Sequence, residues 1–235
     1  MKYRLLSFCM AVLLLISMIS VPRIEAANST ETFKDSADTK IVKLLEALGL
    51  MEIDSETGFF WDEMPVKRSE LAKIICKMFN ISETKDASPH FTDVSDYDRA
   101  YIETAIRNGY MSGYDNEKFG PDDYVTNIQL IKTFVTALGG DAAAQSQGGY
   151  PGGYITIGNM LGLLKGKAVA NENISRRIDV ANIIYTALHA DVLEIAGSVG
   201  NNINYKTVEG YTFLTEKRNI YRVKGIISQN EATSL

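Results

Sequence analysis

Two arginines occupy an electrostatically unfavourable position in this sequence. Arg68 and Arg177 each stand at the first helical position of an apolar segment with helical spacing. The amino end of a helix is positive, so a cation there costs about 0.3–1 kcal/mol. An anion bound between the guanidinium and the free N–H groups of the first turn would offset that cost. An exposed arginine without a role, or one paired with a neighbouring segment, agrees equally well with the sequence.

An acidic residue lies two positions after each arginine, at Glu70 and Asp179. Such carboxylates are typical of helix caps as well as of binding sites, and capping is the simpler interpretation. A third segment, residues 126–129, aligns with the other two and has the pattern of a capping box. In that segment Asn127 replaces the arginine and Gln129 replaces the acidic residue.

No catalytic constellation accompanies these residues. The two histidines, His90 and His189, lie far apart, and no Cys or His occurs at metal-ligand spacing. The sequence also contains no nucleophile motif and no phosphate-binding glycine loop. The acidic segment 113–126 lacks the spacing of a calcium loop and favours a solvated turn. We therefore expect no enzymatic activity, no cofactor and no metal.

The arginine segments belong to a pattern that occurs three times. Each copy contains a glycine that ends a short helical stretch, in Gly49-Leu50-Met51, Gly109-Tyr110-Met111 and Gly162-Leu163-Leu164. Glycine is the expected left-handed stop of a helix, and a second apolar helix follows each stop. The pattern predicts three helix–loop–helix units that share one core. We call residues 33–80 unit one, 91–139 unit two and 154–191 unit three.

The first residues have the features of a secretory signal. Lys2 and Arg4 form a basic start, an apolar run covers 5–19, and Ala26 precedes the expected cleavage site. The apolar run is shorter than the roughly 20 residues that a membrane span needs. We therefore expect residues 1–26 to be removed, with no membrane insertion of the mature chain.

The remaining segments are expected to connect or flank the three units. They are a polar lead (27–32), a linker (81–90), a glycine-rich loop (140–153) and a linker or start of a further domain (201–235). Within the last segment, apolar residues between Tyr211 and Ile227 indicate a short β tail.

Charge and cysteine content narrow the class of protein. Without residues 1–26, the chain has 21 basic and 28 acidic residues, a net charge of −7. This balance argues against nucleic acid or an anionic membrane as a general partner, and it leaves room for a local anion site. One cysteine remains, Cys76, so no internal disulfide can form. An exported chain without disulfides suits a bacterial cell envelope.

At several of these positions the chain resembles the S-layer homology domain family. The motifs that carry the resemblance are Phe91-Thr92-Asp93-Val94, Gly109-Tyr110-Met111-Ser112-Gly113-Tyr114, Phe119-Gly120-Pro121-Asp122 and Val125-Thr126. They lie in unit two, and weaker copies extend the resemblance over residues 33–190. The resemblance implies a mainly α fold, in which three helix–loop–helix repeats form a pseudo-threefold bundle.

The resemblance also implies a function. Family members attach exported proteins non-covalently to a secondary polysaccharide linked to peptidoglycan, often through an acidic pyruvylated sugar. Their binding arginine lies in a Thr-Arg-Ala-Glu motif, which falls on Arg68 and on Arg177, with Arg176 as the alternative. The glycan-binding residues implied in this way are Arg68, Glu70, Gly113, Tyr114, Arg177 and Asp179. Unit two has Asn127 at the arginine position, so we expect its own copy of the site to contribute little.

We therefore expect a non-enzymatic anchoring module of the cell wall or S-layer that binds an anionic secondary cell-wall polysaccharide. One alternative is a repeat scaffold that contacts proteins at the cell surface, such as an S-layer protein. Another is that the chain is the anchoring part of a longer surface enzyme.

Overall fold

The computed structural model describes residues 39–81, 91–164, 171–199 and 202–218. The predicted signal (1–26), the lead (27–32), all but the first residue of the linker 81–90, and the end of the chain from residue 219 lie outside the described residues. All of the described residues belong to one compact unit, and the description below concerns them alone.

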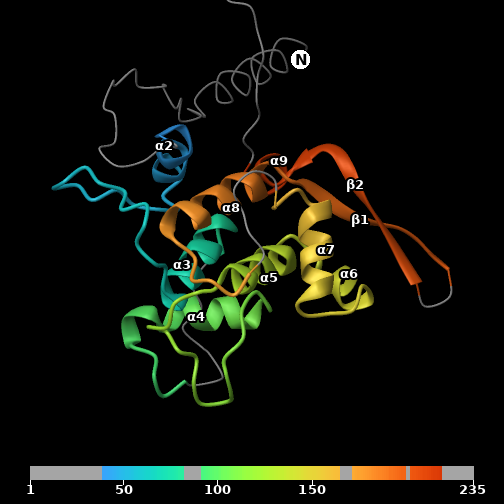
Figure 1. Cartoon of the computed structure of the whole chain (residues 1–235). Helices are drawn as coiled ribbons and strands as arrows, with labels where there is room; N and C mark the ends of the chain where they lie inside the picture. The colour runs from blue at the N-terminus through green and yellow to red at the C-terminus, as the bar shows by residue number, and fades with distance from the viewer. Residues whose placement is uncertain (1–38, 82–90, 165–170, 200–201, 219–235) are drawn as a thin grey trace, which may run out of the picture. The chain divides into compact units, whose positions relative to one another are not determined.

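The fold is mainly α, as predicted (Figure 1). Its elements, in chain order, are α2 (Thr39–Ala47), α3 (Arg68–Met78), α4 (Asp96–Arg107), α5 (Asn127–Ala137), α6 (Asp141–Ser146), α7 (Gly152–Met160), α8 (Arg177–His189), β1 (Asp191–Val199), β2 (Asn202–Thr212) and α9 (Phe213–Arg218). Among the described residues, no helix combines the length and the apolar character that crossing a bilayer requires.

The helices within the three segments that we call units are α2 and α3, α4 and α5, then α7 and α8. The stop glycines Gly49, Gly109 and Gly162 adopt φ values of 66°, 73° and 75°, a left-handed conformation that costs glycine nothing. The second helix of each unit packs on the first helix of another unit, α3 on α4, α5 on α7 and α8 on α2. The helices of all three units therefore interlock in a cycle.

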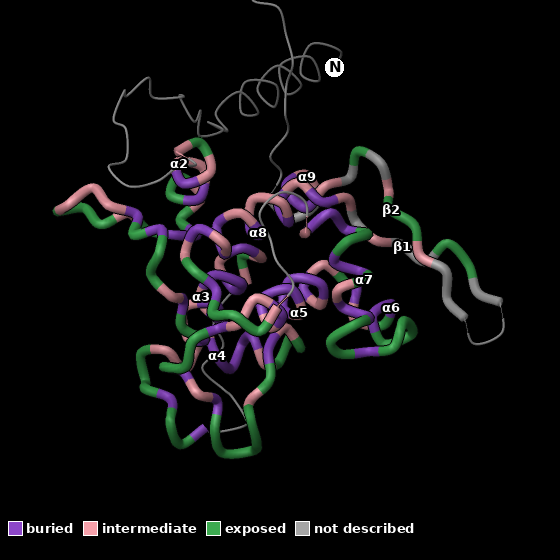
Figure 2. The backbone as a smooth tube through the Cα atoms, in the orientation of Figure 1, coloured by how far each residue is buried: buried purple, intermediate pink, exposed green. Residues whose placement is uncertain are grey.

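One hydrophobic core joins the units, and Figure 2 shows its buried segments running through the helices. Fully buried side chains come from unit one (Leu45, Leu71), unit two (Ile102, Phe134) and unit three (Val180, Leu188). Burying one such side chain contributes about 1.5–3 kcal/mol. Because these side chains belong to one continuous cluster, the core depends on all three units together.

A closed ring of backbone hydrogen bonds ties together the segments that enter the three second helices. Val66 N–H donates to the Ser175 carbonyl (3.2 Å), Ser175 N–H to the Val125 carbonyl (2.8 Å), and Val125 N–H to the Val66 carbonyl (3.0 Å). All three residues are buried, so each of these polar groups needs its partner. The ring fixes the starts of α3, α5 and α8 relative to one another.

The glycine-rich segment 140–153 is not a continuous loop, which corrects the sequence-based expectation. It contains α6, and Gly152 already begins α7. The reason is the run Ala142–Ala144 between the glycines, because alanine is the strongest helix former. Ala143 and Ala144 are buried, and α6 packs on α7.

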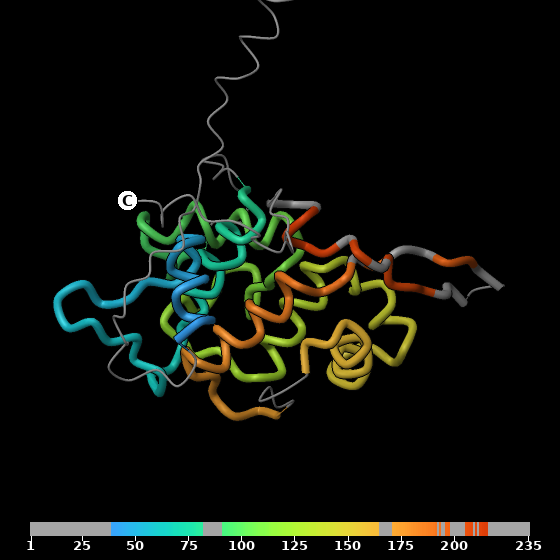
Figure 3. Tube along the Cα trace, turned by 90° about the horizontal axis from the view of Figure 1, so that it is seen from above, coloured from blue at the N-terminus to red at the C-terminus, as the bar shows by residue number. Residues whose placement is uncertain are grey.

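The strands also lie earlier in the chain than predicted. β1 and β2 pair antiparallel over residues 191–212, whereas we expected strands between Tyr211 and Ile227. Residues 219–227 of that range lie outside the described part of the chain; within 211–218, only Tyr211 and Thr212 belong to a strand, and α9 follows them. Leu193 pairs with Thr207, and Ile195 pairs with Tyr205. Three of these four residues are β-branched or aromatic, and such residues favour strands. Figures 1 and 3 both show this pair extending away from the helices.

Candidate functional site

Arg68 reaches from the start of α3 into the loop of unit two. Its Nε donates to the Phe119 carbonyl (3.0 Å), and its Nη2 donates to the Ser112 carbonyl (2.7 Å). The guanidinium carbon lies 4.5 Å from the centre of the Phe119 ring and 4.7 Å from that of Tyr114. The residue is only 6% exposed. Such contacts hold a buried cation in one orientation.

Arg177, in unit three, makes the corresponding contacts with the loop of unit one. From the start of α8, its Nε donates to the Phe60 carbonyl (2.8 Å) and its Nη2 to the Glu52 carbonyl (2.8 Å). Its guanidinium carbon lies 4.8 Å from the centre of the Phe60 ring. Arg177 has one further partner, because its Nη1 lies 2.6 Å from Glu70 Oε1. This carboxylate neutralises the cation at short range.

Gln129 is the residue of unit two that corresponds to Glu70, and it leaves Arg68 without such a partner. No carboxylate of the described residues forms an ion pair with Arg68. Burial lowers the pKa of Arg68, while Tyr114, Asp123 and Asp93 act in the opposite direction from beyond ion-pair distance. Burial therefore removes more stabilisation from the charged guanidinium than its neighbours restore.

Arg68 lines a cavity of about 290 Å³. Lys132 contributes a second cation to its wall, and none of the described residues that line it is acidic. Gly113 also lines this cavity, and its position leaves no room for a side chain, because a Cβ atom there would lie 2.6 Å from the Phe91 ring. Tyr114 and Tyr150, both about half exposed, also line the cavity. The cavity can accept a small anionic group beside aromatic faces.

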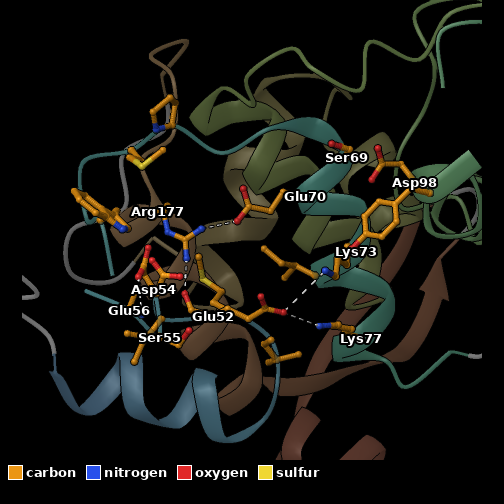
Figure 4. A pocket seen from close by; sticks show the side chains of 18 residues that line it. Glu52, Asp54, Ser55, Glu56, Ser69, Glu70, Lys73, Lys77, Asp98 and Arg177 are labelled. Carbon is orange, nitrogen blue, oxygen red and sulfur yellow. Dashed lines mark hydrogen bonds and ion pairs between the residues drawn. The ribbon is translucent and has the colours of Figure 1, made fainter. Parts of the chain in front are cut away.

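Arg177 lines a second, larger cavity of about 840 Å³. Figure 4 shows Arg177 turned toward Glu70, and Glu52 between Lys73 and Lys77. The cations in this cavity are therefore paired with carboxylates of the same cavity.

The corresponding residue of unit two, Asn127, lines neither of these cavities. Asn127 Nδ2 donates to Asn171 Oδ1 (2.8 Å), and Asn127 Oδ1 accepts from the buried Ser175 hydroxyl (2.8 Å). These contacts join the start of α5 to unit three. The role of Asn127 in the structure is thus a polar link next to the ring of backbone hydrogen bonds.

Comparison with known proteins finds a family model that matches part of the chain. Residues 90–130 match the sequence model of the S-layer homology domain. This segment of the chain is therefore similar to the S-layer homology domain. It is also 26% identical over 175 residues to the "Middle cell wall protein" of Brevibacillus brevis (strain 47 / JCM 6285 / NBRC 100599), and 26% identical over 181 residues to the "Surface layer protein" of Brevibacillus choshinensis.

These alignments cover 72% and 74% of the chain, but the chain spans only about 16% of the length of each relative. The S-layer homology domain at residues 90–130 supplies the loop that receives Arg68, including Ser112, Tyr114 and Phe119. These findings relate the chain to proteins of the cell wall and the surface layer.

Asp93 holds this loop of the S-layer homology domain in place. Its carboxylate accepts hydrogen bonds from the backbone N–H groups of Phe119 (3.0 Å) and Gly120 (2.8 Å). Burial acts to raise its pKa, but these two hydrogen bonds lower the pKa of Asp93 below its usual value. The acidic residue of the Phe91-Thr92-Asp93-Val94 motif therefore positions the carbonyl that Arg68 uses.

The predicted site residues fall into three groups. The smaller cavity brings together Arg68, Gly113 and Tyr114, and the larger one brings together Glu70 and Arg177. Asp179 lines neither of these cavities, because its carboxylate accepts from the Arg176 backbone N–H (3.2 Å) as a helix cap does.

Arg176 itself is half exposed and pairs with Glu63 (3.0 Å) and Asp179 (2.9 Å), which raise its pKa. The contacts of Arg177 match those of Arg68, so Arg177 and not Arg176 is the structural counterpart of Arg68.

Sequence reasoning missed several residues that line the cavities, above all Lys132 and Trp61. Lys132 lies three residues after Gln129 on α5, which places both on the same face of the helix. This spacing could have identified it. Trp61 stands out in the sequence only as the single tryptophan, and nothing local shows that its ring lines a cavity.

Proposed function

We propose that this chain anchors a protein to the cell wall by binding an anionic secondary cell-wall polysaccharide without a covalent bond. Its location is the cell wall or S-layer, in agreement with its S-layer homology domain and with relatives named for the cell wall and the surface layer. The negatively charged group of the glycan, of the pyruvate-ketal type, occupies the smaller cavity beside Arg68.

The burial and the incomplete hydrogen bonding of Arg68 are the main support for this proposal. Its guanidinium is buried, and Nη1 donates to no acceptor among the described residues. Lys132 adds a second positive charge to the same cavity. A carboxylate ligand would give the guanidinium the ionic partner that Glu70 gives to Arg177.

The two arginines are therefore not equivalent in the proposal. We predicted from the sequence that Arg68 and Arg177 would share the glycan affinity. An anion at Arg177 has to compete with Glu70, which already lies 2.6 Å from its Nη1. Arg177 stays a predicted glycan contact, but we assign the larger part of the ionic affinity to Arg68.

The test is the affinity of Arg68→Ala for wall-polysaccharide fragments, measured by isothermal titration calorimetry. A charge-assisted hydrogen bond contributes about 1.5–3 kcal/mol, so we expect binding to weaken about 10- to 150-fold. Arg176→Ala is the matched control, because Arg176 is also an arginine at the start of a helix but lines neither cavity. Equal affinities of Arg68→Ala and the parent chain, with an unchanged melting temperature, would contradict the proposal.

A further inference from the structure

The chain leaves the helical body at Ala190 and returns to it at Phe213. Between these residues β1 and β2 pair with each other, and the pair Asp191–Thr212 brings the two ends of this excursion together. Phe213 N–H donates to the Ala190 carbonyl (3.2 Å), and α9 packs against α8 (Figure 1). Phe213 is only 3% exposed and belongs to the hydrophobic core. The first residue of α9 is thus fixed to the body by its backbone and by its side chain.

The Phe213 ring contacts the far end of the helix that carries Arg68. Arg68 begins α3, and Phe79 is the C-cap residue of the same helix. The ring centres of Phe213 and Phe79 lie 4.6 Å apart with 75° between the ring planes, an edge-to-face arrangement. The Phe79 ring also stacks on Tyr110, with ring centres 5.0 Å apart and 29° between the planes. Phe213, Phe79 and Tyr110 therefore form an aromatic row that runs from α9 through unit one to unit two.

Tyr110 connects the aromatic row to the smaller cavity. It begins the segment 110–114, and all five residues of this segment line that cavity. Arg68 holds the later part of the segment through the Ser112 carbonyl and the Tyr114 ring. The stack of Tyr110 on Phe79 holds its beginning. Residues at the two ends of α3 thus fix this wall of the cavity.

We propose that Phe213 is a positioning residue of the smaller cavity, which acts through Phe79 and Tyr110 without lining the cavity itself. Edge-to-face aromatic pairs contribute more than their buried area, because the positive edge of one ring meets the negative face of the other. Without the Phe213 ring, Phe79 loses this contact and supports Tyr110 less firmly. A ligand would then have to order the segment 110–114 when it binds, at a cost in affinity. The inference rests on the proposed function only in taking a ketal-bearing glycan fragment as the ligand.

Phe213→Leu tests this role while keeping an apolar side chain in the core. The probes are size-fractionated oligosaccharides from the wall polysaccharide of the producing organism, before and after mild acid removal of ketal groups. In calorimetry we expect Phe213→Leu to bind the ketal-bearing oligosaccharides about two- to tenfold more weakly than the parent. Tyr205→Leu is the matched control and should bind like the parent. Tyr205 is also an aromatic residue that packs on the core, from β2, but the ring contacts among the described residues do not include it.

A double-mutant cycle separates positioning from general destabilisation. Phe79→Leu interrupts the aromatic row, so adding Phe213→Leu to it should cost no further affinity. Affinity losses that simply add would mean that Phe213 does not act through Phe79, and this result would overturn the proposal.

Hydrogen exchange gives a readout that needs no ligand. Tyr110 N–H donates to the Ala105 carbonyl (3.0 Å) at the start of the cavity wall. We expect this amide to exchange faster in Phe213→Leu than in the parent or in Tyr205→Leu. Because coupling between two sites is reciprocal, the ketal-bearing oligosaccharides should slow exchange of the Phe213 N–H in the parent.

The two proposals fail in different ways. If Arg68→Ala weakens binding but Phe213→Leu binds like the parent, the positioning role is wrong and the anion site stands. If removal of ketal groups and Arg68→Ala both leave the calorimetric affinity unchanged, the anion site is wrong. Exchange of the Tyr110 amide then decides the positioning role by itself, and an unchanged rate in Phe213→Leu would overturn it.

Discussion

Under the proposed function, Gln129 leaves Arg68 available to an anion in the smaller cavity, and exchanging the Gln129 side chain tests this directly. Gln129→Glu places a carboxylate in the smaller cavity at the position where Glu70 pairs with Arg177 in the larger one. The capping box survives, because Gln129 Oε1 accepts the Thr126 N–H (3.2 Å) and a glutamate oxygen can do the same. The change therefore alters the charge of the cavity without removing a structural contact.

The magnitude follows from the interaction that the new carboxylate displaces. An ionic hydrogen bond between Arg68 and the glycan contributes about 1.5–3 kcal/mol, and the carboxylate introduced by Gln129→Glu would compete for the same guanidinium. We expect the affinity for ketal-bearing oligosaccharides to fall about 10- to 150-fold. Because the buried cation gains a partner, the melting temperature should stay equal or rise. Binding of ketal-free oligosaccharides should not change.

Glu70→Gln is the reciprocal variant, since it leaves Arg177 without its carboxylate. We expect the larger cavity to gain affinity for ketal-bearing fragments, seen as a second calorimetric site and as a change in the fluorescence of Trp61, the single tryptophan, which lines that cavity. Glu63→Gln is the matched control: Glu63 also pairs with an arginine, Arg176, but it lines neither cavity. The reasoning is refuted if Gln129→Glu binds ketal-bearing fragments as tightly as the parent while remaining folded.

Two further predictions concern the residues that position the cavities. Asp93→Asn should lower the melting temperature at neutral pH, because the lowered pKa of Asp93 means that its ionised form stabilises the fold. That contribution is complete above the unfolded pKa of about 4 and is lost as the pH falls through the lower folded pKa, so thermal scans of parent and variant should converge in acid. Asn127→Ala should cost about 1–3 kcal/mol in urea unfolding, because it leaves the buried Ser175 hydroxyl without its acceptor, and it should leave calorimetric glycan affinity unchanged. Equal unfolding midpoints for Asn127→Ala and the parent would contradict its structural role.

Local signals in the sequence predicted the helices well. The i, i+3, i+4 spacing of Leu71, Ile74 and Ile75 predicted α3, and the capping box at Thr126 and Gln129 is present. These features depend on neighbours within one turn, so a single segment contains the information. The prediction of a loop over the glycine-rich segment was wrong because glycines on either side of a short alanine run do not prevent that run from forming a helix.

The candidate site was predictable only in part, because its partners come from distant segments. The arginine positions could be identified, but the carboxylate of Arg177 lies 107 residues away at Glu70. Whether an arginine at the start of a helix is free or paired therefore depends on which unit lies beside it. The same holds for Trp61 and Tyr97, which belong to different units and line one cavity only in the folded chain.

The ring formed by Val66, Val125 and Ser175 makes attachment sensitive to the integrity of the whole chain. A protease cut that detaches any one of these residues leaves the other two with buried backbone groups unpaired. Arg68 lies two positions after Val66, and Arg177 lies two positions after Ser175. Loss of these backbone hydrogen bonds should therefore displace the arginines that line the two cavities. If the chain binds the wall as proposed, damage to unit two, which contains neither arginine, should weaken binding as damage at either cavity does. Under the proposed function, wall binding would then distinguish intact molecules from clipped ones.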